Sequence, residues 1–169
     1  MPVALPGLRK VLAWGVMPAT ALAISLAYTS AVSAATPFDK LFGSWGGSGL
    51  MRLEDGTTRR MRCNTYYTGR ASQLGMVVRC TGDNDNKIEI RSRLSYSGGR
   101  LSGQWEERTY NARGRVSGTA GDNRINLNIT GGGLTGRMAV SLSGSRQNVN
   151  ITTQGIPLKS VTITLARQR

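Results

Sequence analysis

Residues 125–151 are INLNITGGGLTGRMAVSLSGSRQNVNI, and apolar side chains recur at alternate positions in each of its runs. Successive side chains of a β-strand point to opposite faces, so this alternation predicts strands with one apolar and one polar face. Glycine and serine at 131–133 and 143–145 interrupt the runs, and glycine readily adopts the positive φ of tight hairpin turns. The stretch therefore predicts three antiparallel strands joined by two hairpins.

The same alternation extends over most of the chain after residue 35. It recurs at residues 87–96, 101–106 and 161–165, and turn-forming residues occupy 55–56, 82–86, 97–99, 111–114 and 121–123. No segment of this part shows the 3.6-residue period of an amphipathic helix. The sequence thus predicts an all-β, antiparallel up-and-down meander of about eight to ten strands. A meander this long must protect its edges, which favours a closed or nearly closed small barrel, with a β-sandwich as the alternative.

The first 35 residues have the features of a secretory signal peptide. Arg9 and Lys10 precede an uncharged, largely apolar run over 11–28, and small residues follow at 32–35. This order predicts export with cleavage after Ala34 or Ala35, into the periplasm or the extracellular space. The alternative is an uncleaved membrane anchor, which Pro18 disfavours because it interrupts the apolar run. We expect residues 36–169 to form a single all-β barrel domain, with no transmembrane helix once the signal is removed.

Cys63 and Cys80 are the two cysteines of the chain. Folding the segment between them about its midpoint sets Cys63 opposite Cys80 and Tyr67 opposite Met76 in one hairpin. Directly opposed strand residues lie close enough for a disulfide, which an oxidising compartment would allow to persist. The sequence therefore predicts a Cys63–Cys80 disulfide rather than a redox-active pair.

Two short motifs resemble those of known barrels. Phe42-Gly43-Ser44-Trp45 resembles the Gly-x-Trp opening of lipocalin-type barrels, and LSGQW at 101–105 is similar to strand sequences of avidin-like barrels. This resemblance, at the level of the fold, implies an up-and-down calycin-type barrel that carries a small ligand in its mouth. It also implies that Arg167, near the end of the last run, packs on Trp45 as an arginine does in lipocalins.

Alternation alone leaves open which face points inward. A soluble barrel buries its apolar face, whereas a small outer-membrane barrel turns that face to lipid. The apolar runs are short, and the few aromatic residues do not recur at strand ends as a membrane girdle would. We therefore expect the soluble form.

A soluble barrel could bind a small apolar ligand inside. We predict that the ligand-binding residues are Trp45, Met61, Leu94, Trp105, Glu107 and Met138. Glu107 shares the apolar face with Trp105, and a buried carboxylate needs a partner, for which we expect an arginine.

Arginines supply the alternative function, which is docking on an anionic surface or partner protein. After residue 35 the chain has twenty Lys or Arg against nine Asp or Glu. Alternation places five arginines on the outer face of neighbouring strands: Arg60, Arg62, Arg79, Arg91 and Arg93. Such a surface attracts polyanions, and the export signal favours an envelope component over nucleic acid.

The sequence contains no constellation typical of catalysis. It has no histidine, no free thiol and no serine with an evident base. Residues 83–86 lack the glycine and glutamate of a calcium loop, and no helix follows the glycines at 131–133 to bind phosphate. We therefore expect a protein that is not an enzyme, with no metal and no cofactor.

Overall fold

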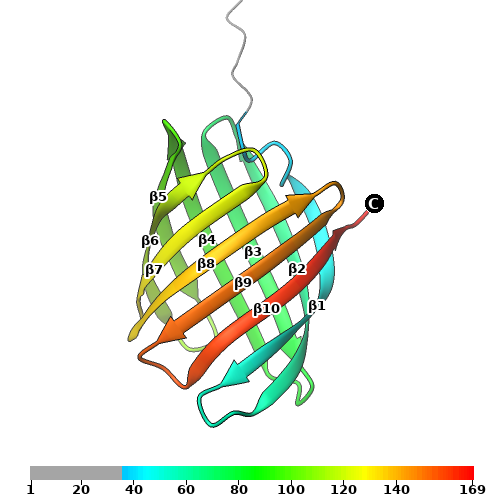
Figure 1. Cartoon of the computed structure of the whole chain (residues 1–169), viewed down its shortest axis with the longest axis vertical. Helices are drawn as coiled ribbons and strands as arrows, with labels where there is room; N and C mark the ends of the chain where they lie inside the picture. The colour runs from blue at the N-terminus through cyan, green and yellow to red at the C-terminus, as the bar shows by residue number, and fades with distance from the viewer. Residues whose placement is uncertain (1–35) are drawn as a thin grey trace, which may run out of the picture. The chain divides into compact units, whose positions relative to one another are not determined.

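The computed structural model describes residues 36–169 (Figure 1), so the predicted signal peptide, residues 1–35, lies outside the described range. Ten strands follow one another: β1 (Gly43–Leu53), β2 (Thr58–Arg70), β3 (Gln73–Gly82), β4 (Lys87–Ser97), β5 (Arg100–Glu107), β6 (Ala112–Ala120), β7 (Arg124–Gly131), β8 (Leu134–Ser143), β9 (Arg146–Gln154) and β10 (Leu158–Arg167). Within this range there is no helix long and apolar enough to cross a membrane.

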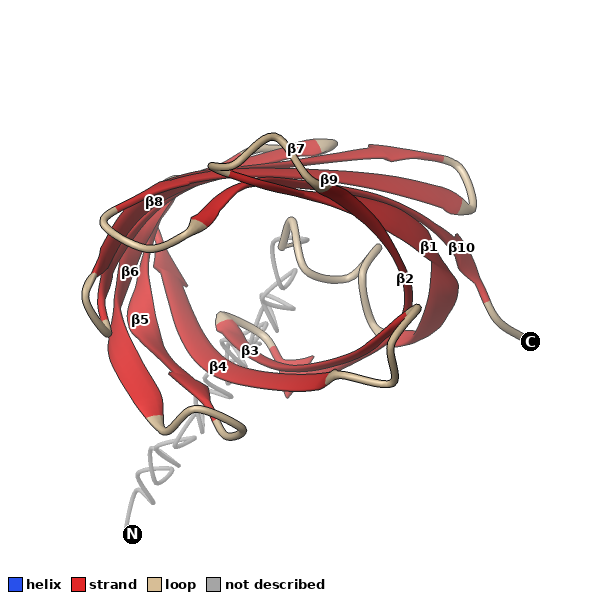
Figure 2. Cartoon of the chain, turned by 90° about the horizontal axis from the view of Figure 1, so that it is seen from below, coloured by secondary structure: helices blue, strands red, loops and turns tan. Residues whose placement is uncertain are grey.

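The ten strands form a closed antiparallel barrel. Each strand pairs with its neighbours in sequence, and β1 also pairs with β10, which closes the ring seen end-on in Figure 2. Closure leaves no strand with an unpaired edge. The predicted meander barrel is confirmed, its ten strands lie within the expected number, and the sandwich alternative is wrong.

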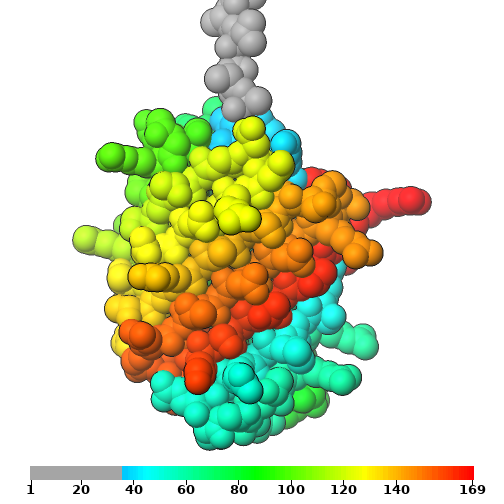
Figure 3. Space-filling model, viewed as in Figure 1, coloured from blue at the N-terminus to red at the C-terminus, as the bar shows by residue number. Residues whose placement is uncertain are grey.

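The apolar face of the barrel points inward. Val140, Val149 and Ile163 lie on three adjacent strands and are 4–6% exposed. The outward neighbours of Val149 and Ile163 are asparagines and threonines, all of them exposed. Figure 3 shows the outer wall over β7–β10 as continuous diagonal bands that follow the tilt of the strands. Its outward positions carry mostly Asn, Thr, Ser and Arg. An outer-membrane barrel needs an apolar outer band, so that alternative is wrong.

Inward-facing glycines allow the wall to bend. A Cβ added to Gly114 or Gly118 would lie 1.8 or 1.9 Å from the carbonyl oxygen of Thr130 or Asn126 on β7. No side chain fits at such a separation, so the two backbones approach this closely only because these residues are glycines. The bends let a sheet of ten strands curl into a barrel.

The two ends of the barrel differ. Residues 36–42, which precede β1, pack across the end where β1 begins, and we call this end the closed end. Phe38 and Leu41 are buried there to 0% and 1% exposure, and the Phe38 ring meets the edge of Tyr96 at 5.9 Å between centroids. The opposite end, formed by the turns at 54–57, 83–86, 108–111, 132–133 and 155–157, we call the open end.

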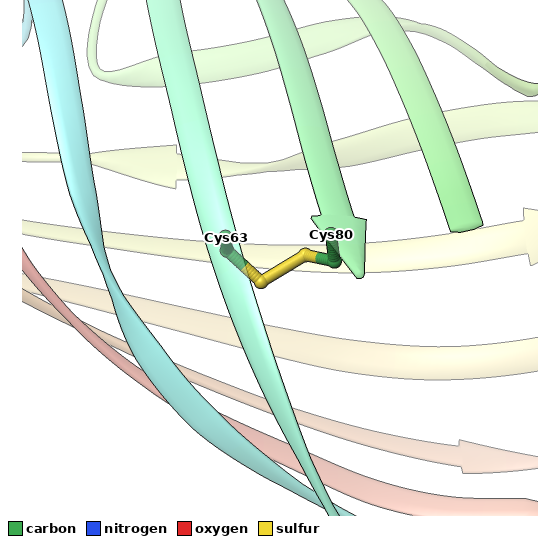
Figure 4. Close-up of a disulfide and its surroundings, with 2 residues drawn as sticks. All are labelled: Cys63 and Cys80. Carbon is green, nitrogen blue, oxygen red and sulfur yellow. A yellow bond between two sulfur atoms is a disulfide. The ribbon is translucent and has the colours of Figure 1, made fainter. Parts of the chain in front are cut away.

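The sequence correctly predicts the hairpin of β2 and β3. Cys63 pairs with Cys80, and Tyr67 pairs with Met76, in an antiparallel register. Both cysteines point inward and form a disulfide with their Cα atoms 4.1 Å apart (Figure 4). The bridge therefore ties two neighbouring strands from inside the barrel and fits an oxidising compartment.

Candidate ligand-binding cup

Apolar side chains line a part of the barrel interior that remains partly exposed, and we call this lining the cup. Its members are inward-facing and pack against the buried core: Met51, Met76, Val78, Ala112, Ile129, Leu134, Met138, Ile151 and Leu158. An inward-facing side chain is exposed only where the interior is accessible. Barrel diameter grows with strand number, and eight strands already suffice to hold one small ligand. The cup is therefore an accessible apolar surface inside the barrel.

The closed end forms the floor of the cup. Phe38, Leu41 and Trp45 are all at most 1% exposed, as is Leu165 on β10. The indole nitrogen of Trp45 donates a hydrogen bond to the carbonyl of Leu41 at 2.7 Å, which fixes residues 36–42 against β1. Residues 36–42 therefore cover the barrel interior at the closed end.

The guanidinium of Arg167 lies over Trp45 from outside this floor. Its Cζ atom is 4.5 Å from the ring centroid, within range of a cation–π interaction. The same guanidinium donates hydrogen bonds to the carbonyl of Phe42 at 2.5 Å and to the carbonyl of Lys40. The packing of Arg167 on Trp45 that the lipocalin resemblance implies is thus confirmed.

Four polar or charged residues of the described chain are buried: Thr65, Ser92, Glu107 and Gln147. Gln147 on β9 is fully buried and donates a hydrogen bond through Nε2 to the hydroxyl of Tyr67 on β2, at 2.8 Å across the interior. Burial raises the pKa of Tyr67 to about 12, although the bond from Gln147 acts in the opposite direction. Among the described residues, Oε1 of Gln147 and Oγ of Ser92 have no hydrogen-bond partner. Unpaired buried polar atoms are costly, so these two could accept or donate to a polar group on a bound molecule.

All six residues predicted to bind a ligand occupy inward-facing positions, but they lie at different depths. Trp45 belongs to the floor, and Met61, Leu94 and Trp105 are buried in the core at 4–8% exposure. The indole nitrogen of Trp105 donates a hydrogen bond to the carbonyl of Thr130 at 3.1 Å. Met138 alone of the six is a member of the cup. Direct contact of these residues with a ligand stays a prediction.

Glu107 has a different partner from the expected arginine. Its carboxylate accepts hydrogen bonds from the backbone amides of Glu89, Thr109 and Tyr110, at 3.2, 2.9 and 2.6 Å. Burial raises the pKa of Glu107, but hydrogen bonds from the amides of Tyr110 and Thr109, from the Thr109 side chain and from the Glu89 amide together lower it by more, so that its pKa lies below the usual value. The expected Arg–Glu pair is wrong because the following turn supplies donors closer in sequence. Glu107 shapes the β5–β6 turn at the open end.

The five arginines predicted to bind an anionic surface all lie on the outer face of β2, β3 and β4, and we call them the arginine wall. Two of them, Arg79 and Arg91, form ion pairs with Glu89 at 2.9 and 2.7 Å. Hydrogen bonds from these two side chains hold the pKa of Glu89 below its usual value. The arginine wall therefore presents less free positive charge than its composition indicates.

Two hollows of the described chain lie away from the cup. One of about 820 Å³ opens on the outer face of β10, β1 and β2, beside Arg60 and Arg62 and facing Asp83 and Asp85. The other, of about 460 Å³, adjoins the β6–β7 turn at the closed end. In residues 36–169 no group of three or more Cys, Asp or Glu is arranged to hold a metal ion.

Most cup members were missed as binding residues at the level of sequence. Ile129, Leu134 and Ile151 follow the same alternation as Met138, so the sequence identifies them as inward-facing. It does not show how far along the barrel each one lies. That position depends on the pairing register, which staggers each strand relative to the next.

Comparison with solved structures addresses the fold. Rv2717c from M. tuberculosis superposes with a TM-score of 0.67 at 15% identity, covering 80% of this chain and 99% of that chain. The S-type phycobiliprotein lyase CPES from Guillardia theta superposes with a TM-score of 0.55 at 15% identity, covering 78% and 90%. No family model and no curated protein matches the sequence. The chain is a ten-stranded closed meander barrel with a calycin-like fold.

Proposed function

We propose that this chain is a non-enzymatic, exported barrel that binds one small apolar ligand in its cup. The observation that most supports this proposal is the partial exposure of inward-facing apolar side chains such as Ile129, Met138 and Ile151. Covering apolar surface releases roughly 25 cal/mol per Å², so a ligand seated on the cup would be stabilised. Because Phe38, Leu41 and Trp45 cover the closed end, such a ligand would enter through the open end.

Two further features support parts of the proposal. The Cys63–Cys80 disulfide and the signal-like residues 1–35 support export. The unpaired Oε1 of Gln147 and Oγ of Ser92 favour a ligand that carries one polar group on an otherwise apolar body.

The test is titration of the barrel with N-phenyl-1-naphthylamine, a neutral apolar probe whose fluorescence rises on burial. We expect saturable enhancement that changes little with salt, since apolar burial is not screened. Ile151→Trp adds bulk inside the cup and should weaken binding about tenfold or more. Thr152→Trp adds the same bulk to the exposed outer face and is the matched control. Absence of enhancement with the wild type, or equal weakening by both variants, would contradict the proposal.

Docking of the arginine wall on an anionic partner is the second candidate function. Arg60 and Arg62 favour it, because they are exposed beside the 820 Å³ hollow. The double variant Arg60→Gln/Arg62→Gln should weaken binding to a soluble anionic polysaccharide, and the wild type should lose affinity steeply between about 50 and about 300 mM salt. Binding that is insensitive to both changes would exclude this role.

A further inference from the structure

Charged residues are distributed unequally between the two ends of the barrel. We compare all the turns at each end, together with the strand-end residues that flank them and, at the closed end, the segments before β1 and after β10. The closed end then holds seven Lys or Arg and two Asp, whereas the open end holds two Lys or Arg and five Asp or Glu. The barrel is therefore electrically polarised along its axis.

Arginine recurs in the hairpins of the closed end. Arg70 ends β2, and Arg100, Arg124 and Arg146 begin β5, β7 and β9. Lys40 and Arg169 add two further exposed cations at this end, so the group has six members. No member of the six forms an ion pair among the described residues, in contrast to Arg79 and Arg91 of the arginine wall. Arg167 is excluded from the group because its guanidinium is held against Trp45.

We propose that the closed end docks on an anionic lipid bilayer surface through Lys40, Arg70, Arg100, Arg124, Arg146 and Arg169. Alternate turns of an antiparallel meander lie at one end of the barrel (Figure 1), so residues at the ends of these hairpins lie around one rim rather than along a line. A ring of cations at one end of the barrel can contact a flat anionic surface all at once. A linear polyanion would instead fit the arginines that lie side by side in the arginine wall. Each Lys or Arg near an anionic lipid surface contributes about 1 kcal/mol to binding.

The cup opens at the other end and would stay accessible in the docked barrel. This proposal does not depend on ligand binding.

The test uses residues 36–169, because the ten strands close without any residue outside that range. Its partners are vesicles of phosphatidylcholine with and without about one third phosphatidylglycerol. We expect binding only to the anionic vesicles, with affinity falling as salt rises. The triple variant Arg70→Gln/Arg100→Gln/Arg146→Gln should weaken binding about a hundredfold. These three side chains are exposed and make no side-chain hydrogen bond or ion pair among the described residues, so folding should be kept.

The matched control removes the same charge from the middle of the outer wall, as Arg93→Gln/Arg115→Gln/Arg137→Gln. It should change vesicle binding by less than about threefold, because these residues lie away from the rim. Equal weakening by the two triple variants would show that only net charge matters, and would overturn the proposal. Failure of the wild type to bind anionic vesicles would overturn it too. If the closed-end triple variant weakened binding to a soluble anionic polysaccharide but not to vesicles, the rim would bind that polymer, and the proposal of a lipid partner would be overturned.

Energy transfer from tryptophan to a dansyl head group gives an orientation readout. After residue 35 the chain has two tryptophans, Trp45 at the closed end and Trp105 near the open end. In the Trp105→Phe variant, Trp45 is the one tryptophan left after residue 35. On anionic vesicles its transfer efficiency should exceed the average efficiency of the two tryptophans in the wild type. A fall in efficiency would mean that the open end faces the lipid, which contradicts the proposal.

Discussion

The guanidinium carbon of Arg167 lies 4.5 Å from the ring centroid of Trp45, so the end of β10 is fastened to the start of β1 across the seam of the barrel. The same group donates hydrogen bonds to the carbonyls of Lys40 and Phe42, which hold the segment that closes the floor. One side chain thus joins the seam and the floor.

Arg167→Ala should lower the free energy of unfolding by about 2 kcal/mol, from the lost cation–π contact and charge-assisted hydrogen bonds. Arg167→Lys keeps the charge but loses the planar guanidinium, so it should restore only part of the free energy of unfolding that Arg167→Ala loses. Chemical denaturation followed by Trp45 emission measures both. Arg169→Ala is the control and should be neutral; an equal effect of both alanine variants would refute the special role of Arg167.

Removing the disulfide should destabilise the barrel without changing its fold. The bridge joins residues 17 apart in sequence, and closing a loop of this size is worth roughly 3 kcal/mol. Cys63→Ser/Cys80→Ser should therefore lower the denaturation midpoint and make it insensitive to dithiothreitol, which should lower the midpoint of the wild type. A reducing agent without effect on the wild type would contradict the bridge.

Tyr67 predicts a loss of stability at alkaline pH. Its pKa is about 12 in the folded barrel against 10.0 ordinarily, so between these values the unfolded chain releases the proton first. Below pH 10 the protonated Tyr67 leaves the free energy of unfolding unchanged. Above pH 10 that free energy falls, by about 1.4 kcal/mol at pH 11. Urea denaturation at pH 8 and pH 11 should show a smaller fall for Tyr67→Phe than for the wild type. Identical falls would exclude Tyr67 as their source.

Glu107→Gln tests whether the carboxylate shapes the open end. Glutamine keeps one acceptor oxygen and puts an NH2 group, which cannot accept, in place of the other, so at least one of the three backbone hydrogen bonds is lost. We expect a loss of about 1–3 kcal/mol and faster amide exchange at Thr109 and Tyr110. Glu106→Gln, on the exposed outer face, is the control. Unchanged exchange at the two amides in Glu107→Gln would show that the turn forms without the carboxylate.

The fold was predictable from the sequence because period-2 alternation and turn glycines act locally. The Cys63–Cys80 register followed from the same local geometry, since the two residues share one hairpin. The contact between Gln147 and Tyr67 was not predictable, because it spans the interior and depends on the stagger of β9 relative to β2. The partners of Glu107 were missed for the opposite reason: they are backbone amides of the adjacent turn, which carry no signature in residue type. The floor was missed because Phe38 and Leu41 belong to no alternating run.

The pairing of β1 with β10 has a consequence for how the protein is made. The first strand cannot pair with β10 until the whole chain has been synthesised. Until then β1 and the newest strand both present unpaired edges, which are prone to association with other chains. The β2–β3 hairpin, by contrast, contains both cysteines and can be oxidised early. Loss of even the last ten residues would leave an open sheet, so a truncated chain should be a target for proteolysis rather than a smaller barrel.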